Sequence, residues 1–325
     1  MMPSSGESSS LSPGAPSLCP GPSGEKREPS LSPEAPPLSR PADGPQETPD
    51  PAERFDLAGL VVLPIPDIDD IATIHTQAEE RRAQLLQGTS TQNTLIYYNV
   101  TTAHLDALDD YPGRITFFGD EVGLVFFRMP LPVHETAHLQ LFLEIFSLLD
   151  RMGLKKKLVA TGTATFKGPG TKKKQGDSGI RPRPPRSAGN QFPTLVIEVG
   201  NSESLPQLYK DRDWWFDASP PGQPRGDVKM VLLIKVYKRN KRILIEQWHR
   251  FFYQSLTAKV EIKPHPQKPF SLHDSSCWLV EGAPMVIAFQ EIFLRPAQGT
   301  ETDIILTKDF FAELAMLCWE SDVTV

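Results

Sequence analysis

One acidic residue inside an apolar strand places the strongest constraint on how this chain can fold. Residues 195–199 read Leu-Val-Ile-Glu-Val, a run of mostly branched aliphatic side chains that predicts a buried strand, and the acid within it is Glu198. An isolated buried carboxylate costs too much free energy to persist. Glu198 must therefore be paired with a cation, protonated or bound to a metal ion, and the rest of the chain has to supply that partner.

The first 53 residues differ in composition from the rest of the chain. Residues 1–53 consist largely of Ser, Pro, Gly and Glu and contain few aliphatic side chains. Such a segment cannot bury enough apolar surface to offset the loss of chain entropy, so we expect a disordered tail. Residues 54–325 are expected to form a single α/β domain.

Charge and apolar patterning limit where the chain can act. The formal net charge of −6 argues against a surface that coats DNA generally. No apolar run approaches the roughly 18 residues that a membrane-spanning helix needs, and residues 1–53 lack the apolar core of a secretion signal. Three scattered cysteines fit neither a disulfide framework nor a zinc cluster. We therefore expect an intracellular protein, nuclear or cytoplasmic, that is not secreted and does not contact a membrane.

The apolar periodicity predicts a mixed order of helices and strands. Leu and Phe recur at helical spacing after Pro132, and Gly153 ends that run. The predicted order from residue 134 is a helix at 134–152, a strand at 158–166, a turn at 168–170, a returning strand that reaches residues 176–180, a strand at 195–199, a helix at 205–217 and a strand at 228–236. This order indicates the α/β (or α+β) class, with a mixed central sheet flanked by helices.

A second acid, Asp177, is placed where it can meet Glu198. Asp177 ends one predicted strand and Glu198 lies in the next, so the two carboxylates can share one end of the sheet. Two such oxygen ligands suit Mg²⁺, which lowers the pKa of a bound water and polarises a phosphodiester. The alternative is structural: Asp177 holds a turn between Gly176 and Gly179, and Glu198 pairs with a strand lysine such as Lys229.

These pieces resemble the restriction-endonuclease-like, or PD-(D/E)XK, nuclease superfamily, and more closely the uncharacterised fungal proteins assigned to it. The resemblance covers about residues 130–250, and its fold has an α-β-β-β-α-β core. The matching pieces are Gly176-Asp177-Ser178, residues 193–204, the Trp214-Trp215 pair and residues 228–234. The resemblance implies a metal-dependent nuclease that cleaves phosphodiester bonds with Mg²⁺-bound water.

The resemblance also implies which residues would form the site. Asp177 matches the first metal carboxylate and Glu198 the second, and Glu144 matches the auxiliary acid that some members supply from the helix before the sheet.

The sequence departs from the superfamily pattern at two positions. Gly200 occupies the place of the catalytic lysine, and Gly176 replaces the proline that normally precedes the first acid. Some members carry the lysine on the following helix, where Lys210 is the candidate. A lysine there would orient the water and stabilise developing charge, which glycine cannot do. The alternative function is therefore a non-catalytic binding module that keeps the nuclease fold.

Residues 134–138 spell a different motif, His-Glu-Thr-Ala-His. On a helix, His134 and His138 share a face and can bind zinc, with Glu135 as general base, which gives a zinc hydrolase as a third option. The competing interpretation is a first helical turn with Glu135 near the positive end of the helix dipole and two exposed histidines.

Lysines precede the first acid closely. Lys172, Lys173 and Lys174 can contact a nucleic-acid backbone beside Asp177, or they can be ordinary exposed loop charges.

Aromatic residues on the second predicted helix have two interpretations. Trp214 and Trp215 fit core positions of that helix better than a platform for stacked bases.

Overall fold

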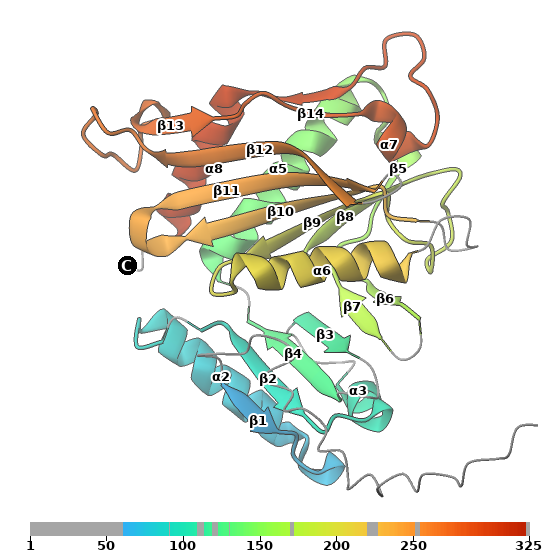
Figure 1. Cartoon of the computed structure of the whole chain (residues 1–325), viewed down its shortest axis with the longest axis vertical. Helices are drawn as coiled ribbons and strands as arrows, with labels where there is room; N and C mark the ends of the chain where they lie inside the picture. The colour runs from blue at the N-terminus through green and yellow to red at the C-terminus, as the bar shows by residue number, and fades with distance from the viewer. Residues whose placement is uncertain are drawn as a thin grey trace, which may run out of the picture. The chain divides into compact units, whose positions relative to one another are not determined.

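Two mixed β-sheets, with the helices packed on them, organise the described part of the chain (Figure 1). The computed structural model describes residues 61–90, 92–108, 114–118, 123–129, 131–169, 172–219, 227–250 and 254–322, and of residues 114–118 the backbone alone. The tail expected at residues 1–53 lies outside the described residues.

The six-stranded sheet combines early strands with a hairpin from later in the sequence. Its order is β1-β2-β4-β3-β7-β6, with β1 parallel to β2 and the other neighbours antiparallel. Ile74 and Leu105, on the helices α2 and α3, share a core with Leu95 and Phe127 of the sheet. The elements are β1 (Val62–Pro64), α2 (Ala72–Leu86), β2 (Thr94–Tyr98), α3 (Thr102–Ala107), β3 (Arg114–Phe118), β4 (Leu124–Arg128), β6 (Thr165–Lys167) and β7 (Lys173–Gln175).

The seven-stranded sheet has helices on both faces. Its order is β13-β12-β11-β10-β9-β8-β5. Its strands are β5 (Leu158–Ala160), β8 (Ser178–Pro182), β9 (Leu195–Gly200), β10 (Met230–Tyr237), β11 (Arg242–Arg250), β12 (Gln254–Pro264) and β13 (Trp278–Glu281). Helices α5 (Pro132–Arg151) and α8 (Lys308–Ser321) share a core with one face, and α6 (Leu205–Ala218) shares a core with the other.

Small elements complete the described chain. Strands β14 (Met285–Ile287) and β15 (Ile304–Leu306) pair with each other, and α7 (Phe289–Phe293) lies between them in sequence. The 3-10 turns are η1 (Ile68–Asp70), η2 (Lys155–Lys157), η3 (Lys238–Asn240) and η4 (Ser275–Cys277).

Alternation along β9 decides where Glu198 points. Side chains of a strand alternate between the two faces of its sheet. Leu195, Ile197 and Val199 belong to the core shared with α5 and α8, whereas Val196 belongs to the core shared with α6. Glu198 therefore points to the face of the sheet that α6 covers, and its side chain is buried there.

The predicted fold class is confirmed. Helix α5, strands β5, β8 and β9, helix α6 and strand β10 follow one another in the order α-β-β-β-α-β. β5, β8 and β9 pair antiparallel in sequence, whereas β9 and β10 pair in parallel and are joined through α6. This mixed sheet flanked by helices is the arrangement expected of a restriction-endonuclease-like core.

The strand predicted at residues 158–166 is wrong in one respect, because the segment is divided between the two sheets. β5 pairs with β8 in the seven-stranded sheet, whereas β6 pairs with β7 in the six-stranded sheet. Gly162, at φ +50, lies at the turn between β5 and β6, a backbone conformation that glycine adopts readily. The chain thus leaves one sheet, forms the β6–β7 hairpin in the other, and returns at Asp177.

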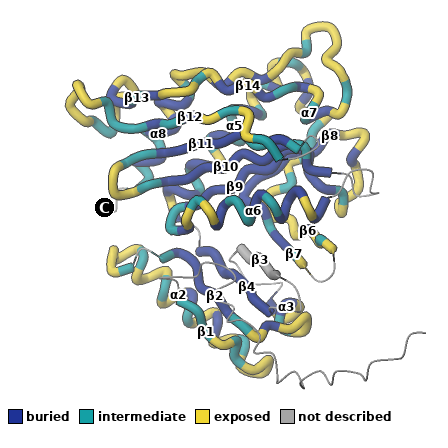
Figure 2. Tube along the Cα trace, in the orientation of Figure 1, coloured by how far each residue is buried: buried dark blue, intermediate teal, exposed yellow. Residues whose placement is uncertain are grey.

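Burial separates the sheet interiors from the loops (Figure 2). Trp214 and Trp215 are buried in the core beneath α6, which confirms their interpretation as core residues. None of the helices in the described ranges combines the length and the apolar composition that a membrane span requires.

The close packing of α6 on β9 gives a testable prediction about stability. A Cβ atom at Gly200 would lie 2.8 Å from Cδ1 of Leu208, well inside the ~3.5–4.0 Å of favourable carbon contacts. We expect Gly200→Ala to lower the free energy of unfolding by about 1–3 kcal/mol, measured by urea denaturation. The control is Gly189→Ala, where the new Cβ meets no atom within 4 Å. Equal stability of the two variants would contradict this account of Gly200.

Candidate functional site

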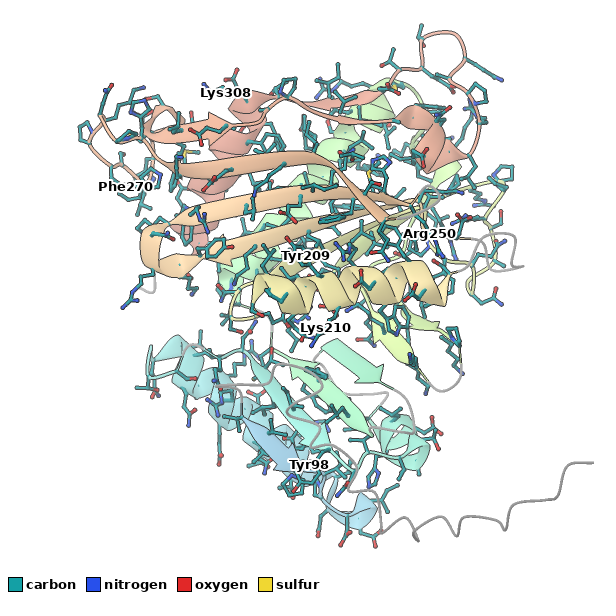
Figure 3. All side chains as sticks on the ribbon, viewed as in Figure 1. Tyr98, Tyr209, Lys210, Arg250, Phe270 and Lys308 are labelled. Carbon is teal, nitrogen blue, oxygen red and sulfur yellow. The ribbon has the colours of Figure 1, made fainter. Side chains whose placement is uncertain are left out.

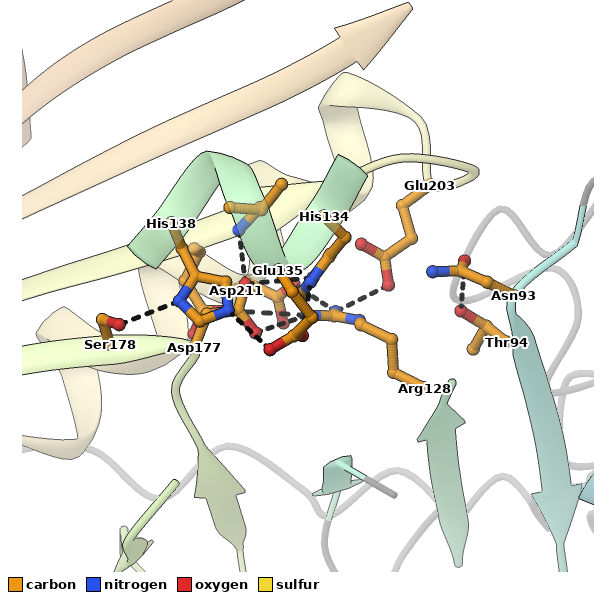
Figure 4. A network of polar contacts seen from close by, with 12 residues as sticks. Asn93, Thr94, Arg128, His134, Glu135, His138, Asp177, Ser178, Glu203 and Asp211 are labelled. Atoms are coloured by element: carbon orange, nitrogen blue, oxygen red, sulfur yellow. Dashed lines mark hydrogen bonds and ion pairs between the residues drawn. The ribbon is translucent and has the colours of Figure 1, made fainter. Parts of the chain in front are cut away.

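A buried cluster of charges lies where the start of β8 and the end of β9 meet α6 and two strands of the six-stranded sheet (Figure 4). All of its members are buried, and it contains four carboxylates and two cations: Asp177, Glu198, Glu203, Asp211, Arg128 and Lys174.

Arg128, the last residue of β4, contacts all four carboxylates. Its Nη2 lies 2.6 Å from Oε1 of Glu203 and 3.2 Å from Oδ2 of Asp211. Its Nη1 lies 3.6 Å from Oε2 of Glu198 and 3.9 Å from Oδ1 of Asp177. One guanidinium therefore bridges side chains from β9, α6 and the segment before β8.

The structure brings Asp177 and Glu198 together. Both carboxylates reach the same nitrogen of Arg128, so their two oxygens are no farther apart than the sum of those two contacts. Oδ2 of Asp177 accepts a hydrogen bond of 2.6 Å from the backbone N–H of Val199, so Asp177 also holds the neighbouring strand β9. Oε1 of Glu198 accepts a hydrogen bond from Nε1 of Trp215.

Lys174 is the lysine that reaches these carboxylates. Its Nζ lies 2.6 Å from Oδ1 of Asp211 and 3.3 Å from Oε1 of Glu198. The side chain is fully buried, so the interpretation of Lys174 as an ordinary exposed loop charge is wrong, and its contact with nucleic acid stays a prediction. The structural alternative, in which Glu198 pairs with a strand lysine, is met by Lys174 of β7. The example given for it, Lys229, pairs with Asp227 at 2.6 Å instead.

The two lysines before Lys174 remain near the surface. Lys172 is exposed, and Lys173 forms an ion pair of 3.2 Å with Asp106. Alternation along β7 explains the difference between Lys173 and Lys174, because successive side chains of a strand point to opposite faces, whereas Lys172 precedes the strand.

Lys210 and Glu144 are the two other site residues predicted from the sequence. Lys210 is half-buried on α6 (Figure 3), one position before Asp211 of the cluster, and its role as a substitute for the catalytic lysine stays a prediction. Glu144 lies 3.9 Å from Arg151 and lines a pocket with residues of α8. Glu144 is ten positions beyond His134, about 15 Å along α5, and His134 is the helix residue next to Asp177.

Packing leaves no room for a lysine side chain at position 200, where the superfamily pattern has its catalytic lysine. The side chain of Leu208 fills the space in front of Gly200, so a lysine there would collide with α6. Directly across the parallel pair from Gly200 lies Lys235 of β10, whose Nζ donates a hydrogen bond of 2.6 Å to the carbonyl of Asn201. Burial lowers the pKa of Lys235 to about 8, against a smaller raising effect of Glu203.

Burial and the two cations act in opposition on the acids of the cluster. Burial raises the pKa of Glu203, because Arg128 and Lys174 compensate only in part. Burial alone would raise the pKa of Asp211 too, but Lys174 and Arg128 outweigh it and hold that pKa below its usual range. Burial would lower the pKa of Arg128, but Glu203, Asp211 and Glu198 outweigh it and raise that pKa. Both cations thus oppose the effect of burial on the pKa values of the buried acids.

The histidine motif forms a second group beside Asp177. His134 and His138 are buried, so the expectation of two exposed histidines is wrong: the start of α5 packs against β8. The carboxylate of Glu135 lies 3.1 Å from Nδ1 of His134 and 3.1 Å from Nε2 of His138. Oδ2 of Asp177 is 3.3 Å from Nε2 of His134, and Oγ of Ser178 is 2.9 Å from Nδ1 of His138.

Three members of the charge cluster were not predicted from the sequence: Arg128, Glu203 and Asp211. Asp211 had a detectable signal, because it lies four positions before Trp215 and so shares the buried face of α6. Arg128 had none, since a basic residue at the end of an apolar strand is commonly exposed.

A stability prediction follows from the burial of Lys174. Removing one partner of a buried ion pair leaves an uncompensated charge, so we expect Lys174→Met to lower the free energy of unfolding by about 3–5 kcal/mol. Lys173→Met is the matched control, because Asp106, its partner, is largely exposed, and should cost less than about 1 kcal/mol. Urea denaturation of both variants measures the difference. A loss at Lys174 no larger than at Lys173 would contradict the buried pairing.

A pH prediction follows from Lys235. Its folded-state pKa lies below that of an unfolded lysine, so the unfolded chain binds more protons between about pH 8 and about pH 10.5. The contribution of Lys235 to the free energy of unfolding therefore rises with pH across that window, by up to about 3 kcal/mol. Urea denaturation as a function of pH should give a steeper rise for the natural chain than for Lys235→Met. Parallel profiles would show that Lys235 titrates normally.

Comparisons with known proteins find similarity in structure and not in sequence. No protein-family model matches the sequence, and no curated protein matches it. Among solved structures, a chain from Anabaena variabilis ATCC 29413 described as a "putative nuclease belonging to DUF820" aligns with a TM-score of 0.34 and 14% sequence identity. The alignment covers 65% of this chain and 98% of that chain. A TM-score this low supports no further argument, so the fold class here rests on strand order and pairing.

Proposed function

We propose that this chain is a divalent-metal-dependent nuclease of the restriction-endonuclease-like type, with Asp177 and Glu198 as the ligands of Mg²⁺. One observation carries the proposal: both carboxylates lie within 4 Å of a single cationic nitrogen, Nη1 of Arg128. Two carboxylates at adjacent strand ends can both reach one cation at this position, and Mg²⁺ binds carboxylate oxygens.

The donor set fits Mg²⁺. Among the described residues, none donates a hydrogen bond to Oε2 of Glu198, which is buried. The cluster holds four carboxylates against two cations, so its formal charge is negative and a divalent ion would balance it. Mg²⁺ prefers such oxygen ligands, and when bound it lowers the pKa of its water ligand and polarises a phosphoryl oxygen.

The cations of the cluster would carry the remaining roles. Lys174, at 3.3 Å from Glu198, would stabilise charge that develops on a phosphate, in place of the lysine absent at Gly200. Arg128 presents a planar guanidinium beside both ligands, which suits two-point recognition of a phosphate. The exposed lysine before β7, Lys172, would contact the backbone of nucleic acid outside the cluster.

A second candidate function has a specific observation in its favour. Arg128 and Lys174 already form ion pairs with the acids from within the chain, and Nη1 of Arg128 lies 3.9 Å from Asp177 and 3.6 Å from Glu198, the two carboxylates that would hold a metal ion. A protein that keeps the fold as a non-catalytic binding module would be stabilised in this way without a metal.

Cleavage of supercoiled plasmid and of single-stranded DNA tests the proposal. We expect the full chain to cut with Mg²⁺ or Mn²⁺, and Asp177→Asn and Glu198→Gln each to reduce the rate at least about 100-fold, because each removes a ligand charge. Glu79→Gln, at an exposed carboxylate of α2, is the control and should cut at the natural rate. Retained cleavage in both ligand variants would refute the assignment. Absence of cleavage by the natural chain with either metal would favour the binding module.

A further inference from the structure

We infer that His134, Glu135 and His138 form a binding site for a divalent transition-metal ion such as Zn²⁺, separate from the Mg²⁺ ligands proposed above. One donor atom from each of these three residues lies within 4.8 Å of the donor atoms of the other two. All three come from the first turns of α5 (Figure 4).

The two histidines face the same carboxylate. Oε1 of Glu135 lies 3.1 Å from Nδ1 of His134, and Oε2 of Glu135 lies 3.1 Å from Nε2 of His138. An ion about 2.1 Å from each ligand in tetrahedral geometry holds neighbouring donors about 3.4 Å apart. The three donor atoms lie within 4.8 Å of one another, so binding would draw the side chains together around the ion.

The second nitrogen of each histidine supplies independent support. Nε2 of His134 lies 3.3 Å from Oδ2 of Asp177, and Nδ1 of His138 lies 2.9 Å from Oγ of Ser178. Histidines that bind a metal through one ring nitrogen almost always have the other held by a carboxylate, hydroxyl or carbonyl, which fixes the orientation of the ring. The ring of His138 has that arrangement through its hydrogen bond with Ser178, and Asp177 lies within ion-pair distance of Nε2 of His134. In both rings the remaining nitrogen faces Glu135.

The chemistry of the donors selects the class of ion. Imidazole nitrogen suits Zn²⁺, Co²⁺ and other transition metals, whereas Mg²⁺ requires oxygen ligands. In this arrangement Glu135 is a ligand, in contrast to the general-base role that the His-Glu-x-x-His pattern suggests, because its carboxylate lies between the two rings. Three protein ligands leave a coordination position open, and the side chain of Glu135, 36% exposed, lies on the solvent side.

Titration of the full, tag-free chain with Co²⁺ in millimolar Mg²⁺ tests the inference, because Mg²⁺ saturates carboxylate sites and the visible spectrum of Co²⁺ reports nitrogen ligands. We expect one Co²⁺ per chain, displaced by Zn²⁺. Glu135→Gln and His138→Gln should each weaken binding at least tenfold, and Ser178→Ala should weaken it by about 10–100-fold through the orientation of His138. Glu79→Gln is the control for general effects of lost charge.

The outcomes separate this site from the proposed nuclease ligands. Glu198→Gln should leave Co²⁺ binding unchanged, whatever it does to DNA cleavage. If His138→Gln does not fold, as circular dichroism would show, the partly exposed Glu135→Gln decides the result. No Co²⁺ spectrum, or a spectrum unchanged by Glu135→Gln, would overturn the inference and leave the two histidines as hydrogen-bond partners of Glu135 alone.

Discussion

Neutralisation of buried charge is the interaction on which this structure depends. Both cations of the cluster come from the six-stranded sheet, Arg128 from β4 and Lys174 from β7. Of the four carboxylates, Glu198 comes from β9 and Asp211 from α6, whereas Asp177 precedes β8 and Glu203 lies between β9 and α6. A buried ion pair adds little net stability but is costly to break, because each partner left alone is an uncompensated charge. The cluster thus fixes how β4 and the β6–β7 hairpin are placed on the core more than it adds stability.

The same charge balance determines which functions the site can support. As an enzyme, the chain would exchange part of the contact between Arg128 and the acids for a metal ion held by Asp177 and Glu198. As a binding module, it would keep Arg128 where it is. Lys174 serves either role, because its contact with Asp211 holds it beside Glu198 in both.

Asp177 connects the two groups of polar residues. Its carboxylate accepts a hydrogen bond from β9, faces Arg128 on one side and faces His134 on the other. A change at Asp177 therefore acts on both groups, whereas Glu198 and Glu135 each belong to one of them. This is why variants of Glu198 and Glu135 separate the two proposed metal sites and variants of Asp177 do not.

The sequence by itself determined the main helices, the buried strands of the core and the α/β class, because apolar periodicity reflects local backbone geometry and the burial of one face. It also placed Asp177 and Glu198 at one end of the sheet. Tertiary structure alone decided the partners of these acids. Arg128 and Asp211 are 83 positions apart, and Lys174 and Asp211 are 37 apart, so no local pattern encodes their contact. β7 is short and polar, and the burial of Lys174 follows only from the hairpin's place in the second sheet. The histidines, likewise, are buried because β8 packs over the start of α5, a contact between segments 40 positions apart at His138 and Ser178.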